Sequence, residues 1–268
     1  MKREITKIDA STVLTNLIYG PKIFLDIKDS SLSSIILQHG YWEKWVTDIF
    51  LSLLKPGMTV VDIGANCGYY SLLAAKAVGA AGHVHCVEPN PFLHKNLTQS
   101  FLINGYTQVK LHKVAFSDKE GEVTLYTPGS FSGGASIYEI PPSYTDYGAV
   151  TTVKVPAVNF AKYFFDLKAD VIKIDIQGAE PHLIDGLLMV AAKSKNLDLL
   201  MEYAPILWIA AGFNPRSVLE QLTKNNFALE IIACNNTLQK VSLDQLLAVT
   251  KKMETMGGFV DLHLYKRA

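Results

Sequence analysis

Residues 58–70 read Met58-Thr-Val-Val-Asp-Ile-Gly-Ala-Asn-Cys-Gly-Tyr-Tyr70, and this stretch decides the fold class. An apolar run, Met58 to Ile63, ends in a turn with an acid and two glycines, and apolar residues at helical spacing follow from Tyr69 to Ala77. Such an order is typical of a strand–turn–helix unit. Because glycine has no Cβ, the turn can approach a ligand closely. The stretch therefore predicts a nucleotide-type cofactor at the carboxyl end of a first strand.

Strand and helix patterns alternate through the rest of the chain. The expected strands are 58–63, 83–87, 109–116, 123–126, 151–155, 171–176, 197–202, 228–233 and 259–265, and the expected helices are 69–78, 91–104, 181–192, 216–225 and 243–252. This order predicts an α/β fold with a mostly parallel sheet and helices on both faces. The final strand alternates apolar with polar residues, which predicts a half-exposed strand near an edge.

The first 48 residues lie outside this alternation. They contain one strand-like segment, Lys22 to Lys28, and the start of a helix pattern over 41–54 that stops at Lys55-Pro56-Gly57. We therefore expect an accessory segment, 1–48, and a cofactor-binding domain, 49–268. The accessory segment is either a pocket wall or an arm of a homodimer.

Charge and cysteine usage restrict the function classes. Lys+Arg and Asp+Glu are 25 each, so the net charge is zero, whereas a general nucleic-acid binder carries a basic excess. Cys67, Cys86 and Cys234 form no pair by spacing and lie in or beside apolar runs, so we expect small buried hydrophobes in a reducing cytoplasm. No signal-peptide core and no apolar run of about 18 residues is present. We expect a cytoplasmic protein with neither a membrane nor a nucleic-acid partner.

The polar residues at three strand ends indicate which nucleotide binds. The turn after the first strand has no GxGxxG spacing, and Asp62 would repel a pyrophosphate but attract an ammonium group. Glu88, 24 residues after Gly64, is suited to the two hydroxyls of a ribose. Ser117 and Asp118, after the third strand, are placed to reach an adenine edge. These features predict a nucleoside that carries an amino acid.

Each of these residues also has a purely structural explanation. Gly68 allows close packing of a helix, Glu88 stabilises the start of the helix that follows Pro91, and Phe116 is a core side chain. Taken together, the acid, the glycine turn and the second acid at the right interval favour the cofactor site.

Four motifs in fixed order resemble the FkbM family of S-adenosylmethionine-dependent methyltransferases. They are Val-Val-Asp-Ile-Gly-Ala-Asn-Cys-Gly-Tyr-Tyr, Val-Glu-Pro-Asn-Pro, Val-Ala-Phe-Ser-Asp and Ile-Lys-Ile-Asp-Ile-Gln-Gly-Ala-Glu, within about residues 40–205. The resemblance implies a class I methyltransferase sheet of seven strands with the last one antiparallel, and O-methylation of a sugar, polyketide or related small molecule. It also implies roles for individual residues: Asp62, Gly64, Asn66 and Gly68 around the methionine, Glu88 on the ribose, and Phe116, Ser117 and Asp118 beside the adenine.

A second polar cluster, Lys173-Ile-Asp-Ile-Gln-Gly-Ala-Glu-Pro-His182, follows a buried strand. Its head should project at the same sheet edge as the cofactor turn. Asp175 is placed to act as a base, to hold a cation or to position the acceptor, and Glu202-Tyr203, at the end of the next strand, would point into the same crevice. Four side chains together offer the oxygen ligands that magnesium prefers, namely Asp175, Gln177, Glu180 and Glu202.

The metal site has strong alternatives. An acid before Pro181 stabilises a helix start, His182 is typical of a surface or satisfied histidine, and Lys173 is explained by pairing with Asp175. The family carries a glutamate where this chain has Gln177, so one negative charge is lost. We therefore favour Asp175 and Glu202 as acceptor-positioning groups, Asp175 or His182 as the base, Asp175 also beside the cofactor, and no obligatory metal.

Two further segments are expected to shape the pocket. Glu43 has a counterpart in FkbM-like chains, which places it near the cofactor's amino group; the alternative is a solvent-facing helix acid. The loop Phe131–Ser136 resembles a lid, and the tyrosines that follow it, Tyr138, Tyr144 and Tyr147, either cover an acceptor or pack on the sheet edge.

The leading hypothesis is an S-adenosylmethionine-dependent O-methyltransferase that acts on a hydroxyl of a small molecule. A nicotinamide-dependent oxidoreductase is the second, and the missing GxGxxG counts against it. A non-catalytic binding module on the same fold is the third, and the acids retained at three strand ends count against it.

Overall fold

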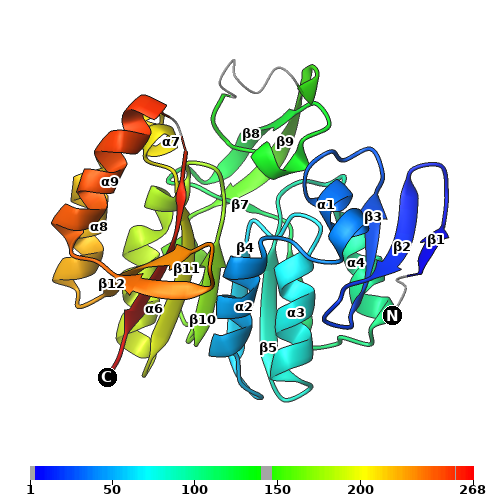
Figure 1. Ribbon diagram of the computed structural model, residues 1–268, viewed down its shortest axis with the longest axis horizontal. Coiled ribbons are helices and arrows are strands. Elements are labelled where there is room, and N and C mark those ends of the chain that lie inside the picture. The colour runs from blue at the N-terminus through cyan, green and yellow to red at the C-terminus, as the bar shows by residue number, and fades with distance from the viewer. Residues whose placement is uncertain (1–3, 140–146, 257) are drawn as a thin grey trace.

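The computed structural model describes residues 4–139, 147–256 and 258–268, arranged around one large twisted sheet (Figure 1). Eight strands form this sheet in the order β13-β12-β14-β11-β10-β4-β5-β6. Their bounds are β4 Thr59–Ile63, β5 His83–Val87, β6 Val109–His112, β10 Val171–Ile174, β11 Leu197–Tyr203, β12 Ala228–Ala233, β13 Thr237–Lys240 and β14 Val260–Lys266. Seven of them have the class I methyltransferase order, and β13 extends the edge as a hairpin with β12.

The strand order reverses beside β4. The chain steps outward from β4 to β5 and β6, and then crosses back to β10 and β11 on the other side of β4. β10 runs parallel to both of its neighbours, with Val171 opposite Val60 and Asp198. In open parallel sheets a ligand binds at the carboxyl ends where the order reverses. The topology therefore places the site between β4 and β10.

Helices cover both faces of the sheet. Helices α2 Lys44–Leu53, α3 Tyr69–Val78 and α4 His94–Ile103 contribute to one apolar core, and α5 Phe160–Tyr163, α6 Ile184–Lys193, α8 Pro215–Lys224 and α9 Leu243–Met256 contribute to the other. The first core includes the fully buried Phe50, Tyr69 and Leu72, and the second includes Leu187, Leu219 and Trp208, which lies in α7 Pro205–Ala210. The strands between the two cores are hydrophobic on both sides, as expected of a buried parallel sheet.

Two small sheets flank the large one (Figure 1). At the N-terminus, β1 Ile5–Lys7, β2 Thr12–Asn16 and β3 Lys22–Asp26 form an antiparallel sheet, followed by α1 Leu32–His39. Its Ile23 and Leu25 belong to the same core as α3. The second sheet has the order β7-β9-β8, from β7 Ala115–Phe116, β8 Gly121–Pro128 and β9 Val150–Val158. It stands above the carboxyl ends of β4 and β5.

The α/β fold, the mostly parallel sheet and the antiparallel final strand are confirmed, and four details are wrong. The segment expected as one strand over 109–116 is two, because the chain leaves the large sheet after His112 and Ala115 pairs with β9. The helix expected over 181–192 begins with a 3₁₀ turn, Glu180–Leu183. Cys234 is exposed, whereas the other two cysteines are buried.

The position of the last strand is the fourth error. β14 lies between β11 and β12, not at an edge. Its polar residues are buried beside polar partners: the Asp261 carboxylate accepts from Trp45 Nε1 at 3.1 Å, and the His263 ring nitrogens lie 2.8 Å from Asp198 and Glu230. The polar residues that alternate with apolar ones in this strand are therefore paired with buried polar side chains and do not face solvent.

The division into an accessory segment, 1–48, and a cofactor-binding domain, 49–268, stays a prediction. The expected boundary between residues 48 and 49 falls within α2. No helix within the described ranges is long and apolar enough to cross a bilayer.

At Gly64 the backbone that follows β4 comes very close to the backbone that follows β10. Its φ of +81° lies in the left-handed region, and a Cβ on it would stand 1.9 Å from the carbonyl oxygen of Asp175. The Asp175 amide donates to the Ile63 carbonyl at 3.0 Å. No side chain fits between these two backbone segments.

Replacing Gly64 by alanine is expected to destabilise the fold by about 3 kcal/mol or more, because the left-handed conformation and the overlap with backbone add. Gly105→Ala is the matched control: its φ is +68° and no atom lies within 4 Å, so only about 1 kcal/mol is expected. Urea denaturation measures both. Equal losses would contradict a role for the Gly64–Asp175 contact.

Candidate active site

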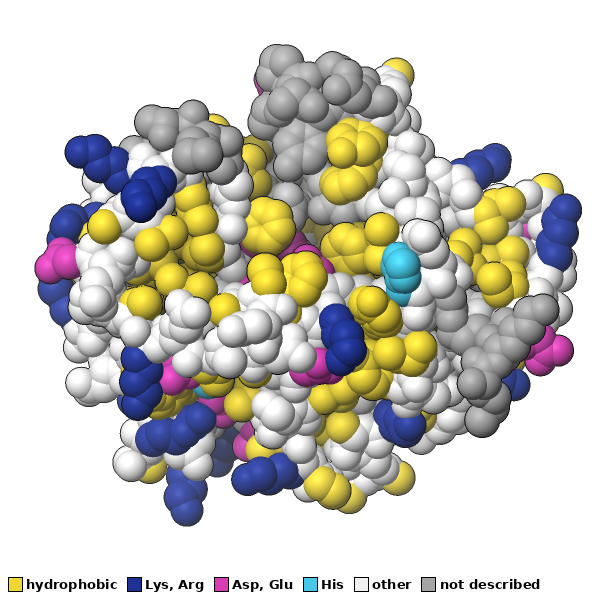
Figure 2. All heavy atoms as spheres, viewed as in Figure 1, with side chains coloured by type: hydrophobic (Ala, Val, Ile, Leu, Met, Phe, Trp, Pro, Cys, Tyr) yellow, Lys and Arg dark blue, Asp and Glu magenta, His cyan; other side chains and the backbone are white. Residues whose placement is uncertain are grey.

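A cavity of about 680 Å³ opens at the carboxyl ends of β4, β5, β10 and β11. Hydrophobic side chains surround a hollow at the centre of the face in Figure 2, and acidic side chains show between them. The apolar part of the wall includes Leu32, Tyr41, Trp42, Phe131, Ile137, Ile206, Leu207 and Phe259. This volume is within the range of small-molecule sites, roughly 300–1,000 Å³.

The turn after β4 is tied to the acid after β5. Asn66 has a left-handed φ of +51°, and its amide donates to Glu88 Oε2 at 2.7 Å. The Asn90 amide donates to the other oxygen of Glu88 at 2.8 Å. Burial raises the pKa of Glu88 to about 7, although the two amides oppose the shift. The Glu88 carboxylate thus lies in the cavity, where ribose hydroxyls would complete its hydrogen bonding.

Two residues of the same turn lie behind the cavity wall. Asp62 is buried and accepts from Ser71 Oγ at 2.7 Å, while its Oδ1 has no hydrogen-bond partner among the described residues. Burial raises the pKa of Asp62, and the nearby Lys173 opposes this. A Cβ on Gly68 would stand 2.5 Å from Leu97 of α4, so this glycine allows close helix packing. Neither residue lines the cavity.

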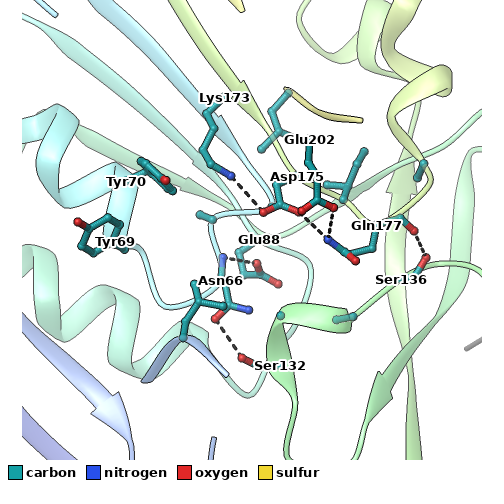
Figure 3. Close-up of a pocket in the computed structure, with 18 of the residues that line it drawn as sticks. Asn66, Tyr69, Tyr70, Glu88, Ser132, Ser136, Lys173, Asp175, Gln177 and Glu202 are labelled. Atoms are coloured by element: carbon teal, nitrogen blue, oxygen red, sulfur yellow. Dashed lines mark hydrogen bonds and ion pairs between the residues drawn. The ribbon is translucent and has the colours of Figure 1, made fainter. Parts of the chain in front are cut away.

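A cluster of charged and amide side chains lies between β10 and β11 (Figure 3). Lys173 Nζ lies 3.2 Å from Asp175 Oδ2, which confirms the predicted pair, and 4.7 Å from the centre of the Tyr70 ring. Gln177 Nε2 donates to Asp175 Oδ1 at 2.8 Å and to Glu202 Oε1 at 2.9 Å. Burial alone would lower the pKa of Lys173, but the carboxylates around it raise the pKa above its ordinary value.

Of the two carboxyl groups in this cluster, Glu202 is the one without a cation beside it among the described residues. Burial raises its pKa well above the ordinary value, and the charges of Asp175 and Glu180 add to the effect. The neighbouring Tyr203 was expected to point into the cavity, but it does not line it. Tyr203 is fully buried, with its hydroxyl 2.8 Å from Thr250 Oγ1.

Glu180 has a structural role that the sequence left open. Its carboxylate accepts from the amides of Ile176 and Gly178 at 2.9 and 3.0 Å and from Trp208 Nε1 at 2.8 Å. It is buried and does not line the cavity. The Glu180 carboxylate is therefore engaged by three donors that shape the loop after β10. It does not join Asp175, Gln177 and Glu202 at the cavity, so the four-residue magnesium site is not assembled.

Glu43 lies at the cavity wall and does not face away from it. It precedes α2 in a left-handed conformation, with φ +34°, and Tyr70 Oη donates to its Oε2 at 3.3 Å. Burial, followed by the charge of Asp261, raises the pKa of Glu43 to about 8.

His182 stands outside the cavity lining. Its Nε2 lies 2.7 Å from Tyr138 Oη, and its Nδ1 lies 4.0 Å from Asp118 Oδ1. Burial lowers the pKa of His182. The structure therefore separates it from Asp175 and Glu202 and joins it to the loop that follows β8.

Of the residues predicted to lie beside the adenine, Phe116 lines the cavity and Ser117 does not. Phe116 lines the cavity, although it is buried and meets Phe160 edge to face at 4.9 Å between ring centres. The Ser117 amide donates to the Val158 carbonyl, and its side chain donates to Asp118. Ser117 is thus a turn residue of the small sheet.

Sequence reasoning missed the serines that join the expected lid to the site. Ser132 Oγ donates to Asn66 Oδ1 at 3.1 Å, and Ser136 Oγ donates to the Gln177 carbonyl at 2.8 Å. On its other side, the Ser132 amide donates to Asp29 at 3.0 Å. Serines in a Gly/Ser-rich loop carry no periodic signal. Tyr147 packs on Phe131, and Tyr144 lies outside the described residues.

Acidic side chains outnumber basic ones in the cavity lining. Within the described chain, the acids that line it are Glu43, Glu88, Asp175 and Glu202, and the bases are Lys44 and Lys173. Lys44 pairs with Asp48 at 2.6 Å. In the same part of the chain, no cluster of three or more His, Cys, Asp or Glu is arranged to hold a metal ion. S-adenosylmethionine carries positive charges on its sulfonium and ammonium groups, so these carboxyl groups fit it.

Known proteins that share sequence with this chain include two methyltransferases. The protein-L-isoaspartate O-methyltransferase of Methanothermobacter thermautotrophicus is 34% identical over 56 residues, which is 21% of this chain and 26% of that protein. Its counterpart from Methanothrix thermoacetophila is 45% identical over 40 residues, 15% of this chain and 19% of that protein. The chain thus matches about a quarter or less of the length of these curated relatives.

Solved structures resemble the fold at low sequence identity. The AdoMet complex of M. jannaschii TYW2 has a TM-score of 0.49 at 12% identity, over 99% of this chain and 90% of that one. A SAM-dependent O-methyltransferase from Thermotoga maritima has a TM-score of 0.46 at 12% identity, over 98% and 95%.

The methyltransferase FkbM domain matches residues 62–205, from the acid of the cofactor turn to the end of β11. The match covers more than half of the 268 residues and contains Glu88, Asp175 and Glu202. The chain therefore belongs to the FkbM family of S-adenosylmethionine-dependent methyltransferases.

Proposed function

We propose that this methyltransferase transfers the methyl group to a hydroxyl of a small molecule. The observation that carries the proposal is the pair of carboxylates, Asp175 and Glu202, in an otherwise largely apolar part of the cavity. Carboxylates accept hydrogen bonds from a hydroxyl and take up its proton. A carboxylate acceptor, by contrast, would place a second carboxylate beside Asp175 and Glu202.

The chain's own residues would align and deprotonate the acceptor. S-adenosylmethionine, when bound, supplies a methyl group on a sulfonium, so transfer to oxygen forms a C–O bond, breaks the C–S bond and releases one proton. Asp175 is held beside Lys173 and is placed to accept that proton before it passes to solvent. Much of the remaining barrier is lowered by alignment. The apolar walls would exclude water from the reacting atoms.

The remaining expectations for this protein are part of the same proposal. A nicotinamide-dependent oxidoreductase is not favoured, since the family transfers methyl groups. A non-catalytic module is disfavoured by the carboxylates kept at the cavity, and turnover would exclude it. The small-molecule partner, the absence of nucleic-acid and membrane partners, a homodimer and a cytoplasmic location stay predictions.

Glu88→Ala is expected to weaken binding of S-adenosylhomocysteine about a hundredfold or more from a micromolar dissociation constant, because two hydrogen bonds to a charged group are lost. Calorimetry measures this. Glu122→Ala, at an exposed position on β8, is the control and should bind like the unaltered protein. Absence of binding by the unaltered protein would contradict the cofactor assignment.

Binding of S-adenosylhomocysteine should also strengthen as the pH rises from 6 to 8. The free Glu88 has a pKa of about 7, so below that pH the carboxyl must lose its proton to accept both ribose hydroxyls. For one such group the dissociation constant falls about tenfold over this range. Glu88→Gln should remove most of this dependence, and an unchanged slope in that variant would assign it to another carboxyl.

A screen of hydroxyl-bearing acceptors with labelled methyl donor tests the reaction itself. We expect turnover that a chelator does not reduce, because Lys173 and Gln177 occupy the carboxylate oxygens that a metal ion would use. Loss of activity with chelator, restored by magnesium, would show that a metal displaces them. Methylation confined to carboxylates would contradict the hydroxyl assignment.

A further inference from the structure

Gln177 occupies a backbone conformation that a non-glycine residue rarely adopts. Its φ is +51°, and its carbonyl accepts from Ser136 Oγ at 2.8 Å. The loop around it is held by the Glu180 carboxylate, through the amides on either side at Ile176 and Gly178. Strained positions that the surroundings enforce are concentrated at functional sites. Here the enforced backbone directs the Gln177 side chain to the carboxylates (Figure 3).

The side-chain amide of Gln177 has its nitrogen toward two carboxyl groups. An amide NH₂ has two hydrogens, and both are used, on Asp175 Oδ1 at 2.8 Å and on Glu202 Oε1 at 2.9 Å. The reverse orientation would place the amide oxygen against two carboxylates. The Gln177 amide nitrogen is therefore a neutral bridge between acids at the ends of β10 and β11.

The two acids that this amide bridges are not equivalent. Asp175 has a cation, Lys173, 3.2 Å from its second oxygen, whereas no ion pair to Glu202 occurs among the described residues. Two carboxylates in such proximity repel each other unless a donor, a cation or a proton lies between them. The amide supplies donors without adding charge, so it does not neutralise the negative charge that the pair carries.

We propose that Gln177 is a positioning residue that holds Asp175 and Glu202 as a paired hydrogen-bond acceptor for the substrate hydroxyl, in the place between them where a cation would otherwise lie. This inference rests on the proposed function, because it assigns a task to the same carboxylates. It deepens that function by making the charge at the reacting centre depend on one neutral amide.

The donor and its product provide a probe that needs no acceptor. S-adenosylmethionine has a positive sulfonium where S-adenosylhomocysteine has a neutral thioether, so the ratio of their dissociation constants reports the charge at the reacting centre. Calorimetry should be carried out at pH 5.5, 7.5 and 9 on the full chain and on Gln177→Glu and Gln177→Met. Gln221→Glu, exposed on α8, is the matched control for the first change.

The two variants should shift the ratio in opposite directions. Gln177→Glu adds a charge, so at pH 9 its preference for the cationic donor should rise about tenfold, with little change at pH 5.5. Gln177→Met removes two hydrogen bonds that favour the ionised carboxylates, so the pair is protonated more often, and the preference should fall severalfold at pH 7.5 and recover at pH 9. The control should match the unaltered protein throughout.

Manganese titration gives a second readout. The unaltered protein should show no uptake of Mn²⁺ at the cavity, and Gln177→Glu, with three carboxylates together, should bind it. The proposal would be overturned if both Gln177 variants gave the same ratio of dissociation constants as the control. It would also be overturned if the unaltered protein bound Mn²⁺ tightly and Asp175→Asn abolished that binding. If neither donor nor product binds the unaltered protein, the proposed function fails first. If both bind and only the variant effects are missing, this inference alone fails.

Discussion

The close approach of two backbone segments, at Gly64 after β4 and at Asp175 after β10, is the constraint on which the site depends. A Cβ at position 64 would lie 1.9 Å from the Asp175 carbonyl, and the Asp175 amide is bonded to the last carbonyl of β4. These strands are neighbours, and the chain order reverses between them. Residues more than 100 positions apart in sequence therefore meet at one edge, with the donor turn on one side and the acceptor acids on the other.

The second constraint is electrostatic. Burying several carboxylates at one place is unfavourable unless cations, donors or protons compensate. Lys173 lies beside Asp175, two backbone amides bind Glu88, and the Gln177 amide lies between Asp175 and Glu202. Burial still raises the pKa of Glu43 to about 8 and of Glu202 well above its usual range. A cationic methyl donor would favour the ionised forms of these acids, which links cofactor recognition to the preparation of the acceptor site.

The sequence indicated much of the fold because strand and helix periods are local. The bounds of α3, β5 and β12 were read from spacing alone, and the Gly64 turn and Glu88 were recognised by their interval. Local periodicity does not say which face has a partner. For this reason β14 was placed near an edge, although Asp261 and His263 are buried against polar partners from other elements. The roles of Ser132 and Ser136 depend on contacts across about 40 to 70 residues, which no short pattern records.

By itself, the sequence determined the class of the protein: a methyl-donor turn, a ribose acid and an acid after the fourth strand of the core, in the order of the FkbM family. Only the tertiary structure decided what each acid does. Asp62 is buried beneath the turn, and the Glu180 carboxylate binds the amides of a loop. His182 lies away from the cavity, and the Gln177 amide lies between Asp175 and Glu202. The physical reason is that spacing along a chain specifies which strand end a side chain leaves. Its charge state and partners are set by burial and by neighbours from distant elements.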